Sequence, residues 1–74
     1  MNIESLKYFL TVEKYTSFSL AAEKLCISQS SLSKHIKKLE KELNCVLFER
    51  CTRHVNLTYA GITLKKYALN IVNN

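Results

Sequence analysis

Between Ser28 and Leu43 the sequence predicts a helix that carries two chemically different faces. At about 100° of rotation per residue, its apolar side chains fall within an arc of about 60° and are Leu32, Ile36, Leu39 and Leu43. The opposite side spans about 100° and carries Lys34, Lys37, Lys38 and Lys41, with Ser30 pointing the same way. One face can pack into a small core, while the other offers ammonium and hydroxyl groups to a polyanion. Such a helix is typical of those that lie in a groove of DNA.

The length and charge of the chain restrict the classes of function that it can serve. Its 74 residues make one small domain, with no room for an enclosed catalytic cavity and its supporting residues, so we expect no enzyme activity. The 47% apolar content indicates a folded domain, and with no tryptophan and three phenylalanines we expect a thin, aliphatic core. A net charge of +5 favours an anionic partner.

The cysteines indicate free thiols in a reducing cytoplasm. There are three of them, an odd number without a C-x-x-C pair, and we expect Cys26 to be buried as a small apolar residue. His35, His54, Cys45 and Cys51 do not have the spacing of a structural zinc site, so no metal or other cofactor is expected. No apolar run has the length of a signal peptide or a membrane span, which argues against a membrane partner.

Periodicity and capping residues predict three helices, a two-stranded ribbon and a last helix. The expected helices cover residues 3–14, 18–25 after an N-cap at Ser17, and 28–43, with Asn44 ending the third in a left-handed conformation. Residues 46–49 and 55–57 are expected to form short strands, and Thr58 to cap the last helix. That helix places Ala60, Leu64, Tyr67, Ala68 and Ile71 on one side.

The second and third helices, joined by a short turn, have the form of a helix-turn-helix, and the ribbon that follows adds a wing with a basic tip at residues 50–54. The predicted fold is therefore mainly α, a winged helix-turn-helix. Ser30, Ser33 and Lys34 are the expected contacts to base edges, and Lys37 an expected DNA contact, with Ser28 and Ser31 beside them. Lys38 could touch phosphate or only solvent. Arg53 is expected at phosphate or in a narrow minor groove, whereas Arg50 could do the same or pair with an acidic residue.

Several runs of the sequence resemble the amino-terminal domain of LysR-type transcriptional regulators, without gaps and over nearly the whole chain. The runs are 6–9, 17–25, 27–33, 36–43, 47–50 and 57–61. The resemblance implies sequence-specific binding of double-stranded DNA in bacteria, as a homodimer on a partly palindromic operator. It also implies a DNA contact at Gln29, which the helical wheel alone places nearer the buried stripe.

The resemblance further divides the chain into two parts. Residues 1–58 would be the winged helix-turn-helix domain, and residues 59–74 would begin a linker helix that pairs with its twin. In this family a larger effector-binding domain follows, and none of it is present in these residues, so a small-molecule effector could act only through that absent domain.

Four positions depart from the family pattern. Serine at position 30 replaces a usual proline, which removes a fixed φ angle and adds a hydroxyl. Asn44 and Thr16 each stand where glycine is usual. Lys34 occupies a position that is often arginine, and a lysine cannot make the bidentate contact to guanine. These changes bear on the preferred DNA sequence rather than on the fold.

Two other kinds of function remain as alternatives. A helical protein-interaction module would use the Leu32–Leu43 stripe and the last helix against a partner, and would show no salt-dependent affinity for duplex DNA. An amphipathic membrane-surface element would use the basic face, but the narrow apolar stripe opposite it is already needed by the core.

Overall fold

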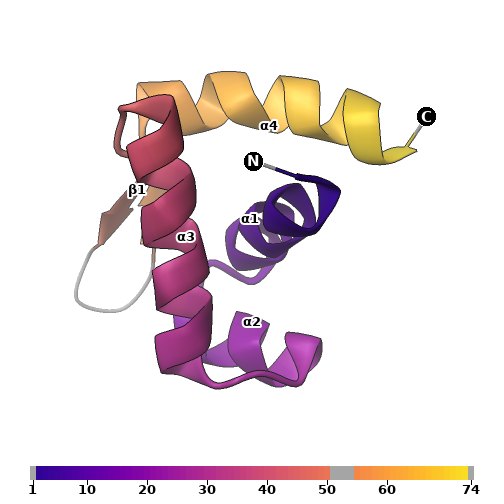
Figure 1. The fold of residues 1–74 in the computed structure, drawn as a ribbon, viewed down its shortest axis with the longest axis vertical. Helices are drawn as coiled ribbons and strands as arrows, with labels where there is room; N and C mark the ends of the chain where they lie inside the picture. Colours follow the sequence, from indigo (N-terminus) through magenta and orange to yellow (C-terminus); the bar gives the residue numbers. More distant parts are fainter. Residues whose placement is uncertain (1, 51–54, 74) are drawn as a thin grey trace.

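The computed structural model describes residues 2–50 and 55–73 and contains four helices and a two-stranded antiparallel sheet in these ranges. The order is α1 (Ile3–Tyr15), α2 (Phe18–Leu25), α3 (Gln29–Leu43), β1 (Phe48–Arg50), β2 (Val55–Leu57) and α4 (Tyr59–Asn73). This arrangement confirms the predicted winged helix-turn-helix. Figure 1 shows α1 near the centre, with α3 along one side of it, α2 below it and α4 crossing above it.

Helices α2, α3 and α4 begin after the capping residues that the sequence predicts, whereas the cap of α1, Asn2, was not predicted. Ser17 Oγ accepts a hydrogen bond from the Leu20 amide, and Thr58 Oγ1 accepts one from the Gly61 amide, both at 3.1 Å. At the start of α1, Asn2 Oδ1 accepts from the Ser5 amide at 2.8 Å. Each of these bonds satisfies an amide that lacks a partner in the first helical turn.

Three helices end at a residue with a left-handed backbone, and none of these residues is glycine. Their φ angles are 49° at Thr16, 59° at Cys26 and 54° at Asn44, which confirms the left-handed conformation predicted for Asn44. At the ends of α2 and α3 the amides of Cys26 and Asn44 donate to helix carbonyls, and the amide of Ile27, the next residue after α2's cap, donates to the Ala22 carbonyl at 3.0 Å.

The core is mainly aliphatic, as expected, and three phenylalanines pack together at its centre. All three phenylalanines are buried, and the ring centroid of Phe48 lies 5.3 Å from that of Phe9 and 5.7 Å from that of Phe18. Aliphatic side chains surround this centre, and Ala21 and Ala22 are buried on α2 as small residues. The buried positions around the rings include Leu6, Val12, Leu32, Ile36, Leu39, Leu47 and Ala68.

The first strand begins two residues later than predicted, at Phe48 instead of Val46. The reason is that the backbone before Phe48 has other partners: the Leu47 amide donates to the Glu40 carboxylate at 2.7 Å, and Thr58 bonds to the carbonyls of Val46 and Leu47. The sheet pairs Phe48 with Leu57 and Arg50 with Val55.

The last helix packs on the core through Ala68 and Gly61 but leaves much of its apolar surface exposed. Tyr67 is 64% exposed and Ile71 is 51% exposed, although both were expected on the same side as the buried Ala68. A salt bridge of 2.7 Å between Lys65 and Glu13 holds α4 against α1. In the described part of the chain, no helix is long and apolar enough to cross a bilayer.

At Gly61 the helix α4 closely approaches the base of the wing. A Cβ atom there would lie 2.3 Å from the Leu47 carbonyl oxygen and 2.8 Å from Leu57 Cδ2. We expect Gly61→Ala to lower the free energy of unfolding by about 1–3 kcal/mol, although alanine normally favours a helix over glycine. Chemical denaturation measures the change. Thr63→Ala, on the exposed side of the same helix, is the control and should have a small effect; equal stabilities of the Gly61 variant and the wild type would contradict the close approach.

Candidate nucleic-acid interface

The candidate interface is the outward face of α3. The helix is fixed from behind by Leu32, Ile36 and Leu39, each at most 1% exposed. Lys34 and Lys37 are exposed on the opposite side, as the two-faced pattern predicted. Because three fully packed side chains hold α3 along its length, the orientation of its outward groups is set by the core.

The first turn of α3 presents hydroxyl groups where the partial positive charge of the helix is concentrated. Ser28 Oγ caps the helix by accepting from the Ser31 amide at 3.1 Å and lies 3.3 Å from Ser30 Oγ. Ser28, Gln29 and Ser30 are exposed, whereas Ser31 and Ser33 are half-buried. Gln29 is therefore open to solvent, although the helical wheel placed it toward the core.

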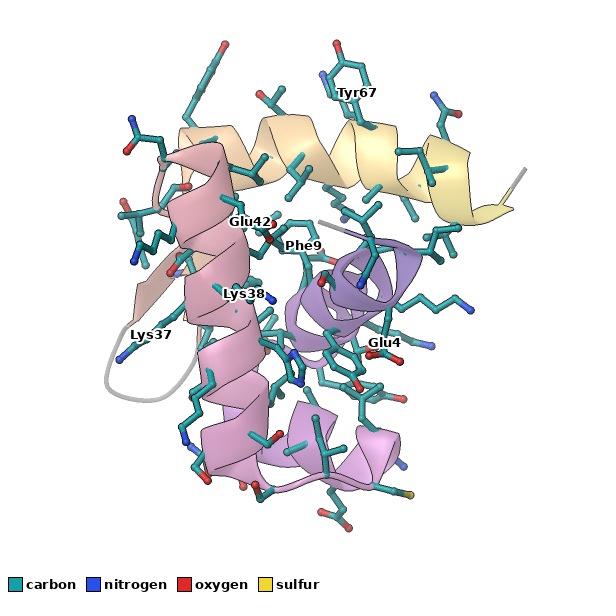
Figure 2. All side chains as sticks on the ribbon, in the orientation of Figure 1. Glu4, Phe9, Lys37, Lys38, Glu42 and Tyr67 are labelled. Atoms are coloured by element: carbon teal, nitrogen blue, oxygen red, sulfur yellow. The ribbon has the colours of Figure 1, made fainter. Side chains whose placement is uncertain are left out.

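The lysines of α3 do not form one uniform patch. Figure 2 shows Lys37 pointing away from α1, on the side of β1, and Lys38 pointing toward the side of α1, where Glu42 also lies. The pKa of the Glu42 carboxylate is lowered below its ordinary value, and the charge of Lys38 contributes to this shift. Lys38 is thus near a carboxylate that offsets part of its charge.

Three other lysines on α3 keep their charge free for a partner. Among the residues that the structure describes, Lys34, Lys37 and Lys41 form no ion pair with an acidic side chain. Together with Ser30, they make the outward face electropositive over most of the length of the helix.

The wing stands beside α3 because short bonds tie its base to the helices. The Leu47 amide donates to Glu40 on α3, and the Val55 amide donates to the Thr16 carbonyl at 3.1 Å. Of the two predicted wing arginines, Arg50 is described only by its backbone pairing with Val55. Arg53 lies outside the described residues.

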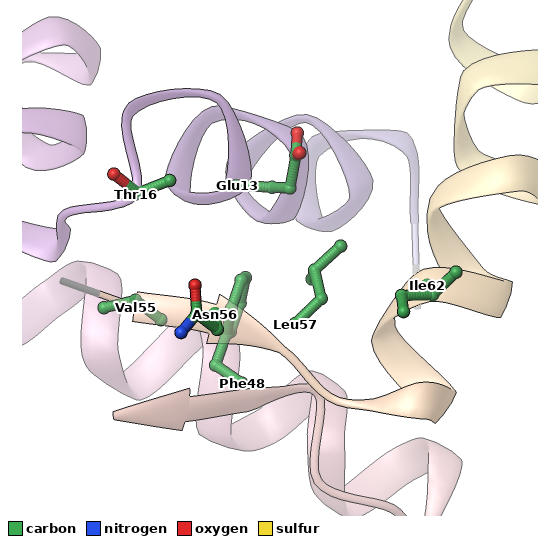
Figure 3. Close-up of a pocket in the computed structure, with 7 residues that line it drawn as sticks. All are labelled: Glu13, Thr16, Phe48, Val55, Asn56, Leu57 and Ile62. Atoms are coloured by element: carbon green, nitrogen blue, oxygen red, sulfur yellow. The ribbon is translucent and has the colours of Figure 1, made fainter. Parts of the chain in front are cut away.

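A groove of about 270 Å³ lies between the end of α1, the strand β2 and the start of α4 (Figure 3). Its lining is Glu13, Thr16, Phe48, Val55, Asn56, Leu57 and Ile62. Glu13 is already engaged by Lys65, so the acid in this groove is neutralised within the domain. The groove separates β2 from the end of α1, and we assign no ligand to it.

A second, more apolar groove of about 420 Å³ runs from the end of α3 to α4. It is lined by Leu43, Cys45, Leu47, Tyr59, Ala60, Thr63, Leu64 and Tyr67.

Cys26 is exposed at the end of α2, so the prediction that it is buried was wrong. It is the C-cap of α2 and has a φ angle of 59°.

Two lysines that the sequence analysis did not assign lie over one aromatic ring. The Nζ atoms of Lys14 and Lys24 lie 5.6 Å and 5.8 Å from the ring centroid of Tyr15. These residues come from the ends of two different helices. No helical periodicity links them, so only the packing of α1 against α2 could have revealed this cluster.

The sequence matches the family model for bacterial regulatory helix-turn-helix proteins of the lysR family over residues 3–62. The chain belongs to the LysR family. Among its relatives, it is 42% identical over 74 residues to the HTH-type transcriptional regulator CitR of Bacillus subtilis and to the regulator BenM of Acinetobacter baylyi. It spans about a quarter of the length of these relatives.

Solved structures of LysR-family proteins share the same fold. The domain superposes on BenM_DBD, in a crystal structure with catB site 1 DNA, with a TM-score of 0.95 and 42% identity, covering 100% of this chain and 82% of that one. A CbnR_DBD–DNA complex gives a TM-score of 0.93 at 34% identity, covering 99% and 84% of the two chains. The winged architecture of this LysR-family chain thus matches that of domains crystallised with DNA.

The geometry of the first turn of α3 predicts that Ser28 stabilises the domain chiefly as a cap. Ser28→Ala should lower the free energy of unfolding by about 1 kcal/mol, because the Ser31 amide loses its acceptor. Ser28→Asp should retain most of the stability, since a carboxylate is a good cap and favours the helix dipole. Thermal unfolding measures both. Ser30→Ala is the matched control, and a loss equal to that of Ser28→Ala would show that the cap is not the main contribution.

Proposed function

We propose that this chain is the DNA-binding part of a bacterial transcription regulator and binds double-stranded DNA in a sequence-specific manner. The single observation that carries the proposal is the outward face of α3, where exposed hydroxyls and lysines that form no ion pair within the described residues oppose a fully buried stripe. The DNA complexes of BenM_DBD and CbnR_DBD support it, because those domains have the same fold.

In this proposal α3 enters the major groove and its two ends have different tasks. Ser30, Ser33 and Lys34, with Gln29, contact base edges near the start of the helix. Ser28 and Ser31 lie at the phosphate-facing tip, and Lys37 holds the DNA backbone. Lys38 adds less, because it lies on the side of Glu42. In the wing, Arg53 would reach phosphate or the minor groove, and Arg50 would make the same kind of contact or pair with an acidic residue.

We further propose that two copies pair through α4 and bind a partly palindromic operator. Tyr67, which lines the groove between α3 and α4, and Ile71, farther along α4, are exposed, so a second copy could cover apolar surface that the single chain leaves open. The two copies of α3 would then enter successive major grooves about 34 Å apart. Residues 1–58 would form the DNA-binding unit and residues 59–74 the start of the dimer helix.

Regulation would come from outside these residues. A small-molecule effector would act through a further domain, because the chain spans about a quarter of the length of its relatives. A non-enzymatic role in the cytoplasm, without a cofactor, fits relatives that are named as transcriptional regulators.

The free charge of Lys37 predicts a salt-dependent loss of binding. Lys37→Ala should weaken binding to all duplex sequences by the same factor and lower the slope of log K against log[salt] by about one, because one phosphate contact is lost. Fluorescence anisotropy with a labelled duplex at several salt concentrations measures the slope. A variant slope equal to that of the wild type would contradict the phosphate contact, and a wild type without salt-dependent affinity would favour a protein-interaction module.

The placement of Ser33 and Lys34 near the start of α3 predicts a role in the choice of bases. The exchange Ser33→Lys with Lys34→Ser keeps the net charge but moves the hydroxyl and the ammonium group to each other's positions. Selection of bound duplexes from a random pool should then return a different sequence. Lys37→Ala serves as the control and should return the wild-type sequence with weaker affinity; an unchanged sequence for the exchange variant would rule out direct readout by this pair.

A further inference from the structure

The lysines around Tyr15 concentrate positive charge at one corner of the domain. Lys14 is in the last turn of α1 and Lys24 in the last turn of α2, and their Nζ atoms lie 5.6 Å and 5.8 Å from one ring centroid. Both lysines are exposed, whereas Tyr15 is half-buried. The ring therefore provides a fixed support on which two ammonium groups are held in reach of solvent.

No acidic side chain neutralises this corner within the described ranges. The acid next to Lys14 in the sequence, Glu13, forms its salt bridge of 2.7 Å with Lys65 on α4 instead. Neither Lys14 nor Lys24 forms an ion pair in the described part of the domain. Two like charges that share one ring repel each other, so an external anion would relieve this repulsion.

The corner lies where the wing and the helix-turn-helix meet. The carbonyl of Thr16, the residue after Tyr15, accepts a hydrogen bond from the amide of Val55, at which β2 begins, and Figure 3 shows the two residues on opposite sides of the groove. Ser17 comes next and caps α2. In a helix-turn-helix the first helix of the motif crosses the DNA backbone while the second enters the groove. The corner is thus next to the helix end and the wing base that border the groove read by α3.

We propose that Lys14 and Lys24, supported by Tyr15, contact the sugar-phosphate backbone beside the DNA segment that α3 reads. This inference rests on the proposed function, since it needs α3 in the major groove. Lysine suits the task because it acts as a compact point charge toward phosphate and carries no base preference. The corner therefore adds affinity and salt dependence without changing the preferred sequence.

The test uses Lys14→Gln, Lys24→Gln and the double variant, with Lys66→Gln on the exposed side of α4 as the matched control. Anisotropy is measured against a duplex selected by the wild type and against an unrelated duplex. Each corner substitution should lower the slope of log K against log[salt] by about 0.9, with the same loss of affinity for both duplexes. Lys66→Gln should keep the wild-type slope, and a corner double variant that also keeps it overturns the proposal.

The same experiment separates failure of the corner from failure of the proposed function. If Lys37→Ala loses affinity while the corner variants do not, α3 binds DNA and only the corner is wrong. If the wild type itself lacks salt-dependent binding, the proposed function fails. A measurement on the wild type avoids any effect of substitutions on folding: an amine-reactive reagent should label Lys14 and Lys24 less when duplex DNA is bound, and equal labelling with and without DNA overturns the proposal.

Discussion

The contact of Phe48 with Phe9 and Phe18 is the interaction on which the arrangement of this domain depends. It brings together the first strand of the wing, the central helix and the first helix of the helix-turn-helix, with ring centroids 5.3 Å and 5.7 Å apart. A two-stranded hairpin of three-residue strands is not stable alone in water. The wing is therefore held in place by the core, and the core is closed on that side by the wing.

Polar bonds around this aromatic centre fix the direction in which the wing leaves the helices. Glu40 of α3 accepts from the Leu47 amide, and the Thr16 carbonyl accepts from the Val55 amide, so the residue before β1 is bound to α3 and the first residue of β2 to the end of α1. Thr58 serves twice, as the cap of α4 and as a donor to the Val46 carbonyl. A protein that reads a duplex with two separate elements needs them at a fixed distance and angle, and these bonds provide that constraint.

Local features of the sequence were sufficient to predict the helices. The features that depend on long-range contacts could not be predicted from it. Ser17, Ser28 and Thr58 could be recognised as caps because a cap bonds only three residues ahead. The start of β1 could not, since the bond from Leu47 to Glu40 depends on how the loop folds back on α3. The contact of the three phenylalanine rings could not be predicted for the same reason, because these rings come from positions far apart in the chain.

In the candidate site, too, some features follow from the local sequence and others only from the folded chain. The outward direction of Lys34 and Lys37 follows from helical periodicity alone, and the structure agrees with it. Periodicity also grouped Lys38 with them, whereas the position of Lys38 on the side of Glu42 was found only in the structure. The cluster at Tyr15 requires two helix ends to meet. The roles of individual residues toward DNA stay predictions at every one of these positions.

The position of the single glycine shows that, in this fold, steric overlap of a Cβ atom is avoided where the strain of a left-handed backbone is accepted. A left-handed backbone costs a non-glycine residue roughly 1–2 kcal/mol, and the chain accepts this at Thr16, Cys26 and Asn44. Gly61 has no positive φ and is used where a Cβ would overlap the Leu47 carbonyl oxygen. A backbone atom cannot move aside as a flexible side chain can, so this overlap could be relieved only by displacing α4 or the base of the wing. The glycine therefore protects the junction of α4 with the wing, where a shift would disturb both the aromatic centre and the surface proposed for the dimer.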